Sequence, residues 1–569
     1  MQSWSCSVAF GHFSGSQIVQ FAQFAIRTTA STASTPCSGC VGPFLLTATF
    51  FPCVRPLLSS CCCCCCCCCY YGCCYCRCCC CCCCSWRPGG SPTALKSGPS
   101  VRFGVSDPIS LQEPTEFDLA LSEKMREDLE SVFPQETAEG MVQRKEVLVV
   151  LETMFHDWMS KLSAEGGISE EEIRRSTVKI TTLGSYRRTI YNILVFQQRP
   201  NVPREEFFAT FAELLEKRVG DSSVRRRDGM RANPGCVTIR SERSADKWFA
   251  AGNMILYTPI IKLKMRGVCI DLLFARLAKD IGETEEAEEV FRSTGLNATA
   301  TFDGAAASEV TCARDVADQI LQLVPNQETF RATLRFVKYW ARRRGIYSNI
   351  LGFFGGITWS LLVARICQLY PYYAPNQLVN RFFRLYHQWN WTRPVMLCEI
   401  IDPANVPGMT SFKVWNPKAN PADRQHVMPV ITPAFPSMNS TYNVTETTKR
   451  ILLDEFKRGY EVVRDVEAQK ATWGDVHKPF PFFTHFSHFL LLEVLSKSEE
   501  VYNKFSGWVE SKLRILVMQL EAQLEAVNGC FIHPNPVQYD LYGSDPEWPY
   551  GCGMFTALSF SKEDGAPAT

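Results

Sequence analysis

Phe330–Trp359 reads FRATLRFVKYWARRRGIYSNILGFFGGITW, a basic segment followed directly by a polar and glycine-rich one. Its apolar residues recur at the spacing of a helix, at Phe330, Leu334, Val337 and Ala341. Its basic residues line another face of that helix, at Arg331, Arg335, Lys338 and Arg342. Asn326 can cap the start of the helix and Gly345 its end. The pattern therefore predicts an amphipathic helix that leads into a turn.

The same stretch carries groups that suit a nucleotide. A cationic helix face suits a triphosphate, an aromatic ring such as Tyr347 suits a base, and Gly355-Gly356 allows backbone to approach a ligand closely. The alternative is an ordinary solvated charged face on a core helix. Periodicity by itself favours that alternative.

Composition places the chain among globular proteins. It has 569 residues, long enough for three or four domains, with 46% hydrophobic and 21% charged residues. The net charge is +1, so any surface for nucleic acid must be local. We expect no membrane span, because no apolar run outside the cysteine tract is long enough.

Cysteine usage sets the first part of the chain apart. Of the 30 cysteines, 19 lie between Cys61 and Cys84. The tract repeats no ligand spacing and cannot specify one disulfide pattern. A metal-binding or lipidated tract is one interpretation; a translated simple repeat without a selected fold is the other, and composition favours it. We therefore expect residues 1–100 to be a low-complexity leader, disordered or artefactual.

Three strand patterns surround a candidate catalytic residue. Thr177–Leu183 runs into Gly184-Ser185, while Thr258–Leu263 and Val268–Phe274 are joined by a tight turn. Nucleotidyl transfer uses carboxylates on adjacent strands to hold two divalent ions, and Gly-Ser after a strand can bind phosphate. Asp271 lies within the last strand, so it is either a metal ligand or a residue paired with Lys262 or Arg276. The residue by itself leaves these two interpretations equal.

Several segments resemble the eukaryotic nuclear poly(A) polymerases, in the family's order. They are GVSDPISLQEPTEFDLALS, LGSYR, NVPREEFF, IIKLKMRGVCIDLLFARL, the stretch quoted first, HVMPVITPAFPSMNSTYNVT and GWVESKLRILV. The resemblance covers about residues 101–530. It implies an α+β fold with three parts: a nucleotidyltransferase domain of the DNA polymerase beta type, a helical middle domain and an RRM-like C-terminal RNA-binding domain.

The resemblance also implies boundaries and site residues. The N-terminal helices and the nucleotidyltransferase domain take residues 101–280, the middle domain 281–445, the RNA-binding domain 446–550 and a tail 551–569. The N-terminal helices return to the middle domain. Asp271 matches the family's third metal-binding aspartate. The residues that match its ATP-binding positions are Leu183, Gly184, Ser185, Lys262, Lys338, Tyr347, Asn349, Gly356 and Ile357.

One departure from the family affects the catalytic centre. After Gly-Ser-Tyr-Arg the family carries Gly-Ala-Asp-Ile-Asp, whose two aspartates hold the metals, but no Asp or Glu occurs here between Ser185 and Glu205. Either an exon-prediction error removed an acidic segment from the written sequence, or the protein is a true pseudoenzyme. Good matches on both sides of the gap favour the first explanation.

The implied function is template-independent addition of AMP from ATP to the 3′ end of pre-mRNA. The resemblance implies Mg²⁺ or Mn²⁺ as the ion, ATP and the RNA 3′ end as substrates, and a nuclear location. It also implies contact with the pre-mRNA cleavage and polyadenylation machinery. Candidate contacts to the RNA backbone are Lys504, Lys512 and Arg514. The alternatives are a non-catalytic scaffold that binds RNA or a protein partner, and, among enzymes, a terminal uridylyltransferase.

Overall fold

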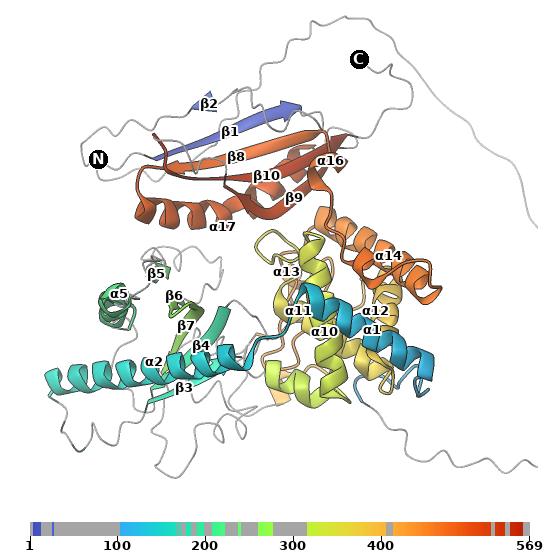
Figure 1. The fold of residues 1–569 in the computed structure, drawn as a ribbon, viewed down its shortest axis with the longest axis horizontal. Helices are drawn as coiled ribbons and strands as arrows, with labels where there is room; N and C mark the ends of the chain where they lie inside the picture. Colours follow the sequence, from blue (N-terminus) through green and yellow to red (C-terminus); the bar gives the residue numbers. More distant parts are fainter. Residues whose placement is uncertain are drawn as a thin grey trace, which may run out of the picture. The chain divides into compact units, whose positions relative to one another are not determined.

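The chain forms two sheets and a group of helices (Figure 1). The computed structural model describes residues 4–12, 26–27, 103–167, 169, 171, 178–183, 190–197, 207–221, 237–240, 260–276, 316–405, 413–524, 530–540 and 547–560. All of them belong to one unit, Met1–Thr29 with Val101–Thr569. Residues 30–100, including the cysteine tract, lie outside the described part of the chain.

The first sheet contains Asp271. Its strands follow the order β3-β4-β7-β6-β5, and their bounds are Val178–Leu183, Ile190–Gln197, Val268–Arg276, Ile260–Met265 and Val237–Arg240. β4 and β7 are parallel, whereas the other neighbours are antiparallel. Arg266 and Gly267 join β6 to β7 with φ of 48° and 82°. Positive φ at both central positions is the geometry that a two-residue hairpin requires.

Helices pack on one face of this sheet. α2 spans Ala138–Glu165, and a π-helical turn at Phe207–Phe211 leads into α5, Ala212–Asp221. Their apolar side chains share a core with alternate residues of β6 and β7: Ile261, Leu263, Met265, Ile270 and Leu272. The alternation arises because successive strand residues point to opposite faces. α2 therefore packs on this sheet, whereas the resemblance placed the N-terminal helices with the middle domain.

A helical domain follows. Its main helices are α10 (Gln327–Arg343), α11 (Gly356–Leu369), α12 (Pro375–Gln388) and α14 (Glu446–Glu467). Trp340, Trp359 and Phe382 form its centre with Phe456, their rings 5.7–6.4 Å apart. α1 (Glu116–Val132) returns to this domain, because Ser122 Oγ donates to Asn376 Oδ1 at 2.7 Å.

The packing of α14 corrects a predicted boundary. The sequence assigned residues from 446 onward to the RNA-binding domain, but α14 contributes Leu452, Phe456 and Val463 to the core of the helical domain. Gly459 lies against the Phe383 ring of α12, so closely that an added Cβ would be 2.5 Å from it. A helix with such a buried face belongs with the helices that it covers.

The second sheet is antiparallel, in the order β2-β1-β8-β10-β9. The bounds of these strands are Ile26–Arg27, Trp4–His12, His488–Ser496, Tyr550–Phe560 and Cys530–Tyr539. α17, Glu499–Leu524, packs on β8 and β9. The short elements are η3 (Pro403–Asn405), α13 (Pro421–Arg424), α15 (Trp473–Val476) and α16 (Phe482–His485).

Two expectations about the chain's ends are corrected by this sheet. β10 continues to Phe560, so the segment after residue 550 is a strand paired with β8 and β9 and not a tail. Within the predicted leader, β1 pairs with β8 from Trp4–Ser496 to His12–His488. Without β1, this edge of β8 would leave backbone N–H and C=O groups unpaired, and β1 supplies their hydrogen-bond partners. Among the described helices, none is long and apolar enough to cross a membrane.

Candidate nucleotide-binding site

The helix predicted from the opening stretch is α10, and both of its predicted ends are confirmed. Asn326 Oδ1 accepts a hydrogen bond from the Thr329 N–H at 3.0 Å, and Gly345 follows the helix with φ of 72°. Glycine adopts this left-handed conformation without steric cost, and it ends the helix. This turn therefore fixes the direction in which the chain continues after the helix.

The basic residues of α10 do not form one cationic face. Arg335 donates to the Glu130 carboxylate at 2.7 Å, and the guanidinium of Arg342 lies 4.8 Å from the centre of the Tyr347 ring. Lys338 is buried, with 7% of its surface exposed. The expectation of a continuous basic surface for a triphosphate is therefore corrected, because these side chains contact different neighbours in the fold. Arg331 is exposed and donates to Gln327 on the same helix, in keeping with the solvated-face alternative.

A buried ion pair anchors the end of α10. Arg344 Nε and Nη2 donate to the two Glu455 carboxylate oxygens at 2.7 Å each, and Nη1 donates to the Lys478 carbonyl at 2.8 Å. The side chains are 5% and 8% exposed. A two-pronged contact of this kind fixes both partners in position. It holds the start of the loop that carries Tyr347 against α14.

The loop between α10 and α11 is fixed by close backbone approach. Asn443 Nδ2 donates to the Asn349 carbonyl at 3.1 Å. Gly352 has φ of 84°, and a Cβ there would lie 2.8 Å from the Asn443 carbonyl oxygen. Only glycine fits this position, because both the backbone conformation and the space exclude a side chain. α11 then begins after Gly355, which supplies no side-chain cap.

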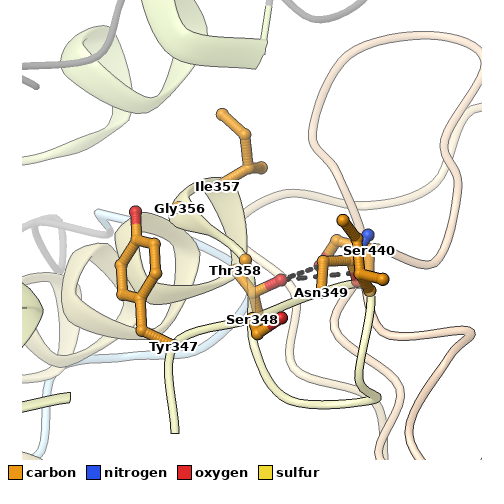
Figure 2. Close-up of a pocket in the computed structure, with 9 residues that line it drawn as sticks. Tyr347, Ser348, Asn349, Gly356, Ile357, Thr358 and Ser440 are labelled. Atoms are coloured by element: carbon orange, nitrogen blue, oxygen red, sulfur yellow. Dashed lines mark hydrogen bonds between the residues drawn. The ribbon is translucent and has the colours of Figure 1, made fainter. Parts of the chain in front are cut away.

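A pocket of about 450 Å³ opens at this loop (Figure 2). Its lining consists of Tyr347, Ser348, Asn349, Ile350, Gly355, Gly356, Ile357, Thr358 and Ser440. Figure 2 shows the Tyr347 ring and the Ile357 side chain beside Gly356, with Thr358 and Ser440 joined by hydrogen bonds. The structure thus brings together four predicted ATP-binding residues: Tyr347, Asn349, Gly356 and Ile357.

The pocket has polar groups that a ligand could satisfy. Asn349 Oδ1 is buried and accepts no hydrogen bond from a described residue. The first turn of α11 lines the pocket with Gly356 and Ile357. Free N–H groups at a helix N-terminus favour negative charge. An aromatic ring, an unpaired amide oxygen and a helix start are together compatible with a nucleotide.

Sequence reasoning missed four pocket residues. Ser348, Ile350 and Thr358 lie inside the opening stretch, but Ser440 comes from 82 residues beyond Thr358. Thr358 Oγ1 donates to Ser440 Oγ at 3.1 Å. The Asn-Ser-Thr run of the segment HVMPVITPAFPSMNSTYNVT was the only available signal, and nothing in its pattern names the residue that it contacts.

Of the remaining predicted residues, Leu183, Lys262 and Asp271 lie on strands of the first sheet, and Lys338 lies on α10. Asp271 of β7 is in register with Lys262 of β6 and with Asn192 of β4, and Leu183 of β3 is in register with Asn192. These four positions form one row across the sheet. Gly184 and Ser185 lie outside the described residues. The alternative pairing of Asp271 with Arg276 is not supported by register, because Arg276 lies on β7 itself.

The five strands carry one acidic residue among them, Asp271. Across the described ranges, no three His, Cys, Asp or Glu side chains lie together as metal ligands would. A two-ion site needs several hard oxygen ligands. The residues of the sheet that the structure describes do not fit such a site.

The predicted RNA contacts share one helix. Lys504, Lys512 and Arg514 all lie on α17, where Lys512 is exposed and Arg514 is partly buried. The side chain of Lys504 is outside the described set.

Two sheets, with a helical domain between them in the sequence, give the chain an α+β architecture, and the helical domain contains the pocket at Tyr347. Three family models match in this order: the poly(A) polymerase nucleotidyltransferase domain over residues 104–228, the poly(A) polymerase central domain over 329–479, and the poly(A) polymerase predicted RNA binding domain over 481–543. With this fold, the matches define an α+β nucleotidyltransferase with a C-terminal RNA-binding domain. The central-domain match ends after α14, in agreement with the packing of that helix.

Curated relatives give the same assignment. Nuclear poly(A) polymerase 1 of Arabidopsis thaliana is 35% identical over 478 residues, which cover 82% of this chain and 60% of that protein. The poly(A) polymerases PAPalpha and PAPa of Candida albicans are 34% and 36% identical, over 74% of this chain and 70% of each relative. The chain belongs to the poly(A) polymerase family.

The chain spans only part of some of these relatives: 60% of the Arabidopsis protein named above and 48% of the poly(A) polymerase of Dictyostelium discoideum. Among solved structures, a cytoplasmic RNA terminal U-transferase matches with a TM-score of 0.39 and 12% identity, over 63% of this chain and 99% of that one. A similarity this low adds nothing to the choice between adenylyl and uridylyl transfer.

Proposed function

We propose that this protein is a template-independent nucleotidyltransferase that adds AMP from ATP to the 3′ end of RNA. Family membership across three domains supports the proposal, and the pocket at Tyr347 is the structural observation that carries it. The family's order of domains supplies a nucleotide site and an RNA-binding domain in one chain. The names of the Arabidopsis relatives support a nuclear location.

In the proposed site, Tyr347 contacts the base, Asn349 contacts the base or sugar through its unpaired Oδ1, and Gly356 and Ile357 approach the nucleotide with their backbone. Lys262 and Lys338 contact the triphosphate, together with Leu183, Gly184 and Ser185. The pre-mRNA cleavage and polyadenylation machinery is the proposed partner, and Mg²⁺ or Mn²⁺ the proposed ion near Asp271.

The strands provide one carboxylate where two-ion chemistry needs several, so we assign no catalytic step to metal ions in this chain. Loss of core catalytic groups typically lowers rates by on the order of 10³-fold or more. This observation favours a second candidate function: a protein that binds ATP and RNA without transferring AMP.

Strand register allows a sharp test of the two candidates. Ile190 and Asn192 are in register with Cys269 and Asp271, whereas Tyr191 and Ile193 are in register with Ile270 and Leu272. Ile270 and Leu272 are buried against the helices. In-register residues lie on the same face of a sheet. Carboxylates at 190 and 192 therefore share the face of Asp271, and carboxylates at 191 and 193 do not.

The assay is extension of an oligo(A) primer by the full chain, with ATP or UTP and with Mg²⁺ or Mn²⁺. Extension with ATP by the unaltered chain supports the polymerase; extension with UTP in its place would refute adenylyl specificity. If the unaltered chain is inactive, the Ile190→Asp/Asn192→Asp variant should gain activity. The Tyr191→Asp/Ile193→Asp variant is its matched control and should remain inactive. If the unaltered chain and the Ile190→Asp/Asn192→Asp variant are both inactive, and calorimetry detects no ATP binding, the proposed nucleotide site is refuted.

A further inference from the structure

The exposed face of α17 carries apolar side chains. Trp508 is 55% exposed, Ile515 45% and Met518 49%. Such exposure is unusual for large apolar residues on a helix that otherwise packs on a sheet, and it marks an interaction surface. The other exposed positions of the described helix on this side are Lys512, Gln519 and Ala522.

Trp508 has the geometry of a stacking platform. Its ring lies parallel to the ring of Phe505, with an angle of 14° and 6.0 Å between centres. Ser511 Oγ donates to the Trp508 carbonyl at 2.6 Å, which fixes the backbone of that turn. One face of the indole is therefore backed by Phe505, and more than half of the side chain remains open to a flat partner.

The charges around this platform suit an anionic chain. Lys512 is exposed one turn after Trp508, and the partly buried Arg514 follows it. Among the acidic residues of α17 whose side chains are described, Glu510 and Glu521 are partly buried, and the exposed Glu499 lies on the opposite side of the helix from Trp508. Glu521 accepts a hydrogen bond from Thr445 Oγ1 at 2.7 Å. An aromatic ring beside a cation is the combination that binds single-stranded nucleic acid without sequence preference.

Phe531 is a second exposed aromatic residue of the same domain, and it can be compared with Trp508 as a stacking residue. Phe531 is also exposed, but the guanidinium of Arg450 lies over its ring at 3.4 Å. That ring already has a cationic partner on the face where a base would stack. Trp508 therefore has the better geometry for a base among these two exposed aromatic side chains.

We propose that Trp508 stacks on a base of the RNA strand while Lys512 contacts a neighbouring phosphate. The inference rests on the proposed function for its ligand, single-stranded RNA, and adds a base-stacking residue to the predicted backbone contacts. Stacking on one aromatic ring tolerates any base, because every base has a flat face.

The test measures binding of fluorescently labelled oligo(A) and of an abasic ribose-phosphate strand of equal length, by anisotropy, without ATP. Trp508→Ala should weaken oligo(A) binding by about five- to tenfold and leave the abasic strand unchanged. Trp508→Phe should restore most of the affinity. Lys512→Ala should weaken both strands and reduce the salt dependence by about one phosphate contact. Val537→Ala removes an exposed apolar side chain from β9 of the same domain, outside the α17 face; it is the control and should bind as the unaltered chain does.

Two results would overturn the proposal. Unchanged oligo(A) binding by Trp508→Ala would assign this face to a protein partner instead. If Trp508→Ala loses equal affinity for oligo(A) and for the abasic strand, base stacking by Trp508 is excluded. Because no nucleotide is turned over, these results are independent of primer extension: an inactive chain whose oligo(A) binding depends on Trp508 would contradict the proposed polymerase function alone.

Discussion

Removing either partner of the Arg344–Glu455 pair should destabilise the helical domain strongly. Both side chains are at least nine-tenths buried and share two hydrogen bonds of 2.7 Å. Arg344→Met leaves the Glu455 carboxylate buried without its cation, and Glu455→Met leaves the guanidinium without its anion. A buried charge that loses its partner typically costs about 3–5 kcal/mol. We expect each single variant to lose about that much of the free energy of unfolding.

The double variant should behave differently. Arg344→Met/Glu455→Met removes both charges and fills similar volume with apolar atoms, a change that is often neutral or stabilising. The Lys478 carbonyl loses one hydrogen bond, which costs about 1–3 kcal/mol if it stays buried and unsatisfied. The double variant should therefore be more stable than either single variant, and the coupling free energy should be about 3 kcal/mol or more.

Urea unfolding, followed by circular dichroism at constant pH, gives these free energies. Calorimetric titration of ATP on the same variants shows whether the pocket loosens with the pair, since Arg344 lies three residues before Tyr347. Losses below about 1 kcal/mol in both single variants, or strictly additive losses in the double variant, would refute the reasoning, because surface pairs behave in that way.

Three further changes test other parts of the structure. Gly352→Ala should cost more stability than Gly167→Ala: both have positive φ, at a cost of about 1–2 kcal/mol, but only Gly352 meets a backbone oxygen at 2.8 Å, while nothing lies within 4 Å of Gly167. Urea midpoints of the two variants check this order. Tyr347→Ala should weaken ATP binding about tenfold and Tyr347→Phe much less, as stacking on an aromatic ring is worth about 1–3 kcal/mol per base; calorimetry that finds equal effects would exclude stacking. Burial, with the nearby charges of Arg343 and Arg458, lowers the pKa of His477 to about 3. The unfolded chain then binds a proton near pH 6.5 that the folded chain does not, so stability should fall by about 2 kcal/mol between pH 7 and pH 5. His477→Phe should remove that part of the loss, and an unchanged pH dependence would contradict the burial argument.

Local features were accessible from the sequence because nearby residues create them. Asn326 and Gly345 mark the ends of α10 through backbone groups within one turn of each. Thr115 and Asp118 form the capping box of α1 in the same way. The alternation of Ile261, Leu263 and Met265 follows directly from the pleat of a strand. These patterns, and the family motifs, predicted the fold class and four of the nine residues that line the pocket.

Contacts between distant residues required the tertiary structure. No periodicity connects Ser440 with Thr358, places Arg342 over the Tyr347 ring, or assigns α14 to the helical domain. The basic residues of α10 look alike in the sequence. In the structure, Arg335 forms an ion pair, Arg342 contacts an aromatic ring and Lys338 is buried. Helix and strand patterns predict which side chains are buried. The residue that each side chain contacts depends on how whole elements pack together.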